Sequence, residues 1–129
     1  MNINVISDLN RLLDKYDKLV FFTPDFCRTY DSLVEELYIK CFNEAESESK
    51  RYLFIFEEVN GTKDKSTGTY VLDPIQSYEI KTLYRTYEFS DKFILIDVHD
   101  EVGTMINYYT TGVLSKDEVI LALFELVKK

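Results

Sequence analysis

The sequence predicts an α/β domain in which a small mixed sheet of about four strands is packed by about five helices. Short apolar runs rich in β-branched and aromatic residues alternate with longer segments in which apolar residues recur at helical spacing. The 129 residues suit a single globular domain spanning 1–129, since no repeat or linker-like stretch divides them. An α+β arrangement is the alternative, because two of the strands look like neighbours in a hairpin.

The first third of the chain reads as helix, strand and helix. Residues 5–16 place apolar side chains on one helical stripe, and Lys18–Thr23 follow as a short strand that is apolar on both faces. Residues 29–45 form the second predicted helix. Ser32 and Glu35 are spaced as a capping box, which predicts that this helix starts there.

The middle of the chain is predicted to contain a hairpin and a third helix. Arg51–Val59 and Tyr70–Asp73 are strand-like, and the polar residues between them suggest an antiparallel hairpin. Residues 73–89 then read as a helix with Asp73 as N-cap and Gln76 three residues later. A strand over Ile80–Tyr87 is the alternative there, because threonine and tyrosine favour β structure.

The last third reads as strand, helix and helix. Asp91–Val98 is an apolar strand, and a helix is predicted from its N-cap Asp100 to a stop at Gly112. A final helix begins at a capping box formed by Ser115 and Glu118 and runs to the end of the chain. This helix follows another helix after a short turn, which suggests a helix-turn-helix motif. Its outward side chains are mostly acidic, however, and do not suit a DNA groove.

Composition narrows the functional classes. The net charge of −8 disfavours binding to nucleic acid through phosphates and suits a partner with a basic surface. The two cysteines are far apart and form no zinc motif, and reduced thiols fit a cytoplasmic protein. The N-terminus lacks the pattern of a signal peptide, and no apolar run reaches the ~20 residues of a membrane span.

The sequence contains no complete catalytic motif. Glycine-rich phosphate loops and the GxSxG nucleophile pattern are missing, which favours a protein that is not an enzyme and has no cofactor. The leading hypothesis is therefore a small acidic protein that binds another protein, as an accessory or inhibitor encoded by a phage or mobile element. The proposed interface residues are acidic or aromatic: Glu35, Glu36, Tyr84, Tyr87 and Tyr108. A homodimer through the apolar C-terminal helix is a further expectation.

The alternative hypothesis is a metal-dependent hydrolase or phosphotransfer domain. Asp25 follows the first predicted strand, and Asp97 and His99 follow the last one. If those two strands are parallel neighbours, these three side chains meet at the same edge of the sheet and suit Mg²⁺ or Mn²⁺. Thr23, Arg28 and Glu101 would lie along the same edge. Cys27 paired with His99 as a nucleophile is a remoter interpretation.

Overall fold

The computed structural model describes residues 5–57, 69–86 and 91–129. Four strands in the described part form one sheet: β1 (Lys18–Phe22), β2 (Tyr52–Glu57), β3 (Thr69–Leu72) and β4 (Phe93–Ile96). The described helices are α1 (Val5–Lys15), α2 (Pro24–Thr29), α3 (Asp31–Ser47), α4 (Pro74–Thr86), α5 (Asp100–Thr110) and α6 (Lys116–Lys128). Strands alternate with helices, so the α/β expectation is confirmed and the α+β alternative is not needed.

The sheet has the order β3-β2-β1-β4, and every pairing in the described part is parallel. The expected mixed sheet with an antiparallel hairpin is therefore wrong: β2 and β3 pair in parallel, from Phe54 with Thr69 to Glu57 with Leu72. Every residue of β2 is buried, which is typical of a parallel strand covered on both faces. The connecting residues 58–68, which suggested the hairpin, lie outside the described residues.

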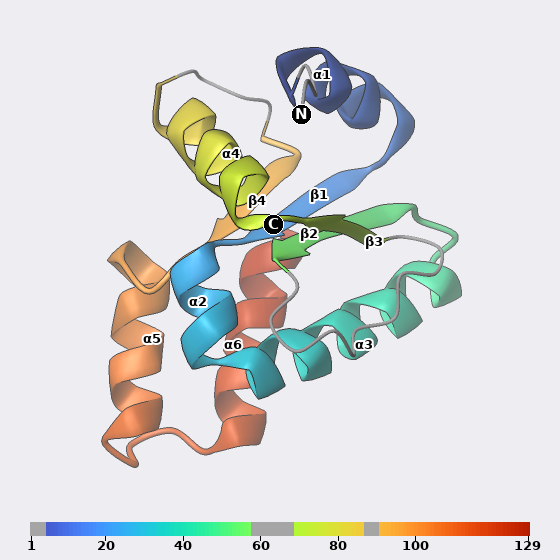
Figure 1. The fold of residues 1–129 in the computed structure, drawn as a ribbon. Helices are drawn as coiled ribbons and strands as arrows, with labels where there is room; N and C mark the ends of the chain where they lie inside the picture. Colours follow the sequence, from blue (N-terminus) through green and yellow to red (C-terminus); the bar gives the residue numbers. More distant parts are fainter. Residues whose placement is uncertain (1–4, 58–68, 87–90) are drawn as a thin grey trace.

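Helices cover both faces of the sheet, which makes the domain three layers thick (Figure 1). On one face α1 and α4 pack over alternate strand residues, including Leu19, Phe21 and Ile55. On the other face α2, α3, α5 and α6 pack over the intervening residues, including Phe22 and Phe54. The alternation of strand side chains thus divides the core into two clusters, one on each side.

Two helices, α4 and α6, begin where the sequence predicts. Asp73 and Gln76 exchange hydrogen bonds of 3.0 and 2.8 Å between side chains and backbone at the start of α4. Ser115 and Glu118 form the predicted capping box of α6. Residues 80–86 belong to α4, so the helix interpretation of that segment is confirmed over those residues.

Two predicted helix starts are wrong. The capping box at Ser32 does not form, because the short helix α2 occupies Pro24–Thr29 and α3 begins at Asp31, directly after Tyr30. This makes six helices in the described part instead of five. Asp100 is the first residue of α5 and His99 is its N-cap, which moves the predicted start by one residue.

The C-terminal helix α6 uses its apolar face inside the domain. Its side chains Val119, Leu123 and Val127 are fully buried in the cluster shared with α3 and α5. This packing accounts for the apolar face that suggested a homodimer, and the dimer stays a prediction. None of the described helices has the length and apolar character that a membrane crossing requires.

Candidate metal centre

The carboxyl ends of β1 and β4 lie side by side, at the place where the strand order reverses. The chain adds β2 and β3 outward from β1 and then returns to place β4 on the other side of β1. The pairing of Phe22 with Ile96 brings the residues after both strands to one edge. In open parallel sheets this is where ligands bind. The conditional expectation that the two strands are parallel neighbours is confirmed.

Asp97 is held at this edge by two hydrogen bonds to one of its carboxylate oxygens. Thr23 Oγ1 donates to Asp97 Oδ1 at 2.7 Å, and the backbone N–H of Val98 donates to the same oxygen at 2.8 Å. Asp97 is only 6% exposed and Thr23 is fully buried. The other oxygen, Oδ2, accepts no hydrogen bond from the described residues; the nearest cation recorded for it is Arg85, at 3.9 Å.

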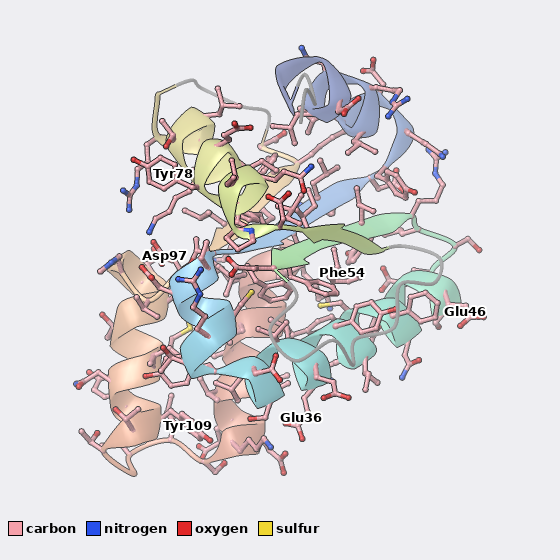
Figure 2. All side chains as sticks on the ribbon, viewed as in Figure 1. Glu36, Glu46, Phe54, Tyr78, Asp97 and Tyr109 are labelled. Carbon is pink, nitrogen blue, oxygen red and sulfur yellow. The ribbon has the colours of Figure 1, made fainter. Side chains whose placement is uncertain are left out.

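Asp25 and His99 complete a cluster with Asp97. Asp25 lies in the first turn of α2, and His99 is the N-cap of α5. One ligand atom from each of the three side chains lies within 4.8 Å of the other two. Figure 2 shows Asp97 beside α2 and the start of α5. The structure therefore brings together the three residues that the alternative hypothesis named, while the presence of a metal ion stays untested.

The spacing of these atoms is close to that of a metal site. Two ligands of one Mg²⁺ lie at most about 4.2 Å apart and two ligands of one Ca²⁺ about 5 Å, from twice the usual metal–oxygen distances. Asp25 and His99 are exposed, so small side-chain rotations can close the remaining gap. Asp97 is the anchored member. Three protein ligands would leave coordination positions for water and a substrate.

Two cations on α4 face the carboxylates. Lys81 Nζ lies 3.3 Å from Asp25 Oδ2, and Arg85 approaches Asp97 Oδ2. These cations neutralise part of the negative charge and also compete with a metal ion. Sequence reasoning missed both, although their spacing of four residues on a predicted helix is the signal that they share one face.

Other residues expected at this edge lie elsewhere or have structural roles. Arg28 does not join the cluster; it forms a 2.8 Å ion pair with the buried Glu57, which raises the pKa of Arg28 by hydrogen bonding and charge. Cys27 is buried and its thiol donates to the carbonyl oxygen of Phe22, which weakens the nucleophile interpretation. Glu101 is exposed and lines a cleft next to Asp97 and His99.

The proposed interface residues that the structure describes lie on both sides of the sheet. Glu35 and Glu36 are exposed on α3, and Tyr108 is 45% exposed on α5. Tyr84 lies on α4, across the sheet, where it packs against Phe93 with ring centroids 5.3 Å apart. Burial raises the pKa of Tyr84. Tyr87 lies outside the described residues, so a single partner would have to contact both sides of the domain.

Known proteins do not identify the site. No protein-family model, no curated protein and no solved structure matches the chain. A proposal for its function therefore depends on the geometry at the carboxyl edge of the sheet.

Proposed function

We propose that the protein binds a divalent cation at Asp25, Asp97 and His99 and uses it to hydrolyse or transfer a phosphate group. The observation that carries the proposal is the convergence of these side chains at the carboxyl ends of two adjacent parallel strands. The two aspartates are far apart in sequence, and His99, the N-cap residue of α5, makes no capping hydrogen bond with its side chain. Hard carboxylate ligands with one imidazole suit Mn²⁺ better than Mg²⁺.

The surroundings favour an anionic substrate. Lys81 and Arg85 each approach one carboxylate of the cluster, and both can turn to a phosphate once a metal ion neutralises those carboxylates. The start of α5 adds the positive end of a helix dipole at His99. The net charge of −8 makes a long polyanion a poor substrate, so a small phosphate ester fits better than nucleic acid.

The chemistry assigned to the site is attack of water or an alcohol on phosphorus. A metal ion lowers the pKa of a bound water and polarises the phosphoryl oxygens. In hydrolysis the water oxygen forms a new bond to phosphorus while the bond to the ester oxygen breaks. The proton that leaves the water ends on the departing alcohol, so the products are inorganic phosphate and that alcohol. Lys81 and Arg85 would hold the charge of the phosphate during this step.

Calorimetric titration with Mn²⁺, Mg²⁺ and Zn²⁺ tests the proposal. We expect one Mn²⁺ per chain, with affinity reduced at least about tenfold in Asp25→Asn and in His99→Gln. Both side chains are exposed, so these changes leave the fold intact. Asp14→Asn, an exposed aspartate on α1, is the matched control and should bind Mn²⁺ like the unchanged chain. Binding that is absent, or equal in all four proteins, would refute the metal site.

The second candidate is a cytoplasmic accessory or inhibitory protein that binds a basic partner. It is favoured by the outward face of α3, where Glu35, Glu36 and Glu46 are all exposed. If this second function is correct, we expect the protein to capture a basic protein from a bacterial lysate. The charge reversals Glu35→Lys and Glu36→Lys together should abolish capture, whereas Asp14→Lys on α1 should not. If the charge-reversed variant captures the same protein as the unchanged chain, the α3 surface is not the binding site.

A further inference from the structure

A cleft of about 390 Å³ opens beside the metal cluster, along the outer strand β4. Asp97, His99 and Glu101 form its polar end, beyond the carboxyl end of the strand. The rest of its lining is largely apolar and comes from four elements: Tyr84, Phe93, Ile94, Leu95, Val102 and Leu126. A molecule with its reacting group at the cluster would therefore place the rest of its structure against apolar side chains.

The walls of this cleft are built from packed elements. Tyr84 of α4 is half-buried and lies against Phe93 with an angle of 46° between the rings. Ile94 and Leu126 lie on the opposite face of the sheet, where both pack against the core cluster that contains Phe22 and Phe54. Because α4, β4, α5 and α6 all contribute, the shape of the cleft is set by the core and exists before any ligand binds.

The size and polarity of the cleft select the ligand. Its volume lies at the small end of the range for small-molecule sites, about 300–1,000 Å³. Apart from the cluster, Tyr84 and Glu101 are the polar side chains among the described residues that line the cleft, and the other lining side chains are apolar. A sugar or an amino acid would lose hydrogen bonds to water on entering the cleft, because the apolar side chains cannot replace them. A flat apolar ring has few such hydrogen bonds to lose.

We propose that the metal site acts on phosphate monoesters of aromatic alcohols, with the phosphate at Asp25, Asp97 and His99 and the ring in the cleft along β4. This inference rests on the proposed function and adds to it the shape of the substrate. It assigns a ligand-binding role to Leu126 and Tyr84, which the chemistry at the cluster does not involve.

Two non-hydrolysable probes test the inference on the Mn²⁺-loaded protein. Phenylphosphonate and methylphosphonate carry the same anionic group and differ in the apolar body. We expect phenylphosphonate to bind about 10- to 100-fold more tightly, from the burial of one ring. Mn²⁺ binding with equal affinities for both probes overturns the cleft assignment and leaves the metal site standing. Failure to bind Mn²⁺ overturns both.

A pair of leucine variants on α6 locates the ring. Leu126→Phe places extra volume in the cleft and should weaken phenylphosphonate at least about fivefold, with Mn²⁺ and methylphosphonate affinities unchanged. Leu121→Phe is the matched control, because Leu121 is 52% exposed on the same helix and does not line the cleft. Equal phenylphosphonate affinities in the two folded variants contradict the assignment. If Leu126→Phe does not fold, the ratio of the two probes on the unchanged chain decides alone.

Discussion

Thr23 and Asp97 are 74 residues apart in the chain, yet the Thr23 hydroxyl donates a 2.7 Å hydrogen bond to Asp97 in a buried environment. The bond joins the residues that follow β1 and β4, and the backbone N–H of Thr23 also reaches Ile96. It holds the Oδ1 atom of Asp97, which also accepts a hydrogen bond from the Val98 N–H. A buried carboxylate held in this way by a neighbouring hydroxyl is the arrangement that orients metal ligands.

Thr23→Val tests this relationship because valine keeps the shape of threonine and replaces the hydroxyl by a methyl group that cannot donate a hydrogen bond. We expect a loss of about 1–3 kcal/mol in the free energy of unfolding, since the buried carboxylate keeps only the Val98 N–H. We also expect Mn²⁺ affinity to fall about 10- to 100-fold. Urea unfolding and calorimetry measure the two effects. Thr111→Val removes an exposed hydroxyl that donates to Asn107, and both quantities should change little there.

Arg85→Gln should change metal affinity and substrate affinity in opposite directions. Removing the cation near Asp97 Oδ2 is expected to raise Mn²⁺ affinity a few-fold, because a competing positive charge is lost. The affinity of the Mn²⁺-loaded protein for methylphosphonate is expected to fall about tenfold. The side chain of Arg85 is 60% exposed, so its ion pair contributes little to stability.

Arg11→Gln on α1 is the control for that change, because it removes an exposed arginine that pairs with Asp8 away from the cluster. It should leave both affinities unchanged. Parallel losses of Mn²⁺ and methylphosphonate binding in Arg85→Gln would mean that Arg85 only supports the local structure.

Apart from the short helix α2, the elements of this fold could be predicted from the sequence because their signals are local. The Asp73–Gln76 and Ser115–Glu118 boxes mark helix starts through hydrogen bonds between residues three apart. The sequence could predict that Asp25, Asp97 and His99 lie close together only on the condition that their strands are neighbours. Their proximity depends on whether β1 and β4 are parallel neighbours, and strand pairing is a tertiary property that periodicity does not encode.

The wrong sheet direction and the errors about residues at the site share the same physical cause, which is tertiary packing. The direction in which β3 pairs with β2 depends on which faces the helices cover, and the sequence between the two strands suits either direction. Arg28 is close to Asp25 in the chain, but the buried Glu57 at the end of β2 binds it instead. Lys81 and Arg85 reach the cluster only because α4 packs across the sheet between β3 and β4, which no local pattern reveals.

Cys41 should make the stability depend on alkaline pH. Burial raises the pKa of the Cys41 thiol from 9.0 to about 12. A raised thiol pKa means that the folded state stays protonated while the unfolded state ionises, so this stabilising term is complete below pH 9 and is lost between pH 9 and 12. At pH 10.5 the loss is about 2 kcal/mol, from 1.36 kcal/mol per pH unit.

Urea unfolding of the unchanged chain and of Cys41→Ala isolates this effect. The variant leaves a small cavity whose cost does not depend on pH, and both chains share the other titrating groups. The stability difference between them should therefore shrink as the pH rises from 8 to 10.5. A difference that stays constant over this range would contradict the assignment.

Gly103 allows the backbone that carries the cluster to approach α5. A Cβ atom at this position would lie 2.6 Å from the carbonyl oxygen of Val98, the residue between Asp97 and His99. Alanine is the better helix former by about 1 kcal/mol, so propensity alone predicts that Gly103→Ala stabilises α5. We expect the opposite, because the contact forces Val98 to move.

The displacement of Val98 should reach both ligands beside it. We therefore expect Gly103→Ala to lower the melting temperature and to weaken Mn²⁺ binding together. Gly112 is the control: its φ is +82° at the end of α5, and a Cβ there meets nothing within 4 Å. Gly112→Ala should cost about 1 kcal/mol of stability through backbone strain, with Mn²⁺ affinity unchanged. Because both variants lose stability and only Gly103→Ala disturbs Val98, a difference in Mn²⁺ affinity between them reports on the position of Asp97 and His99.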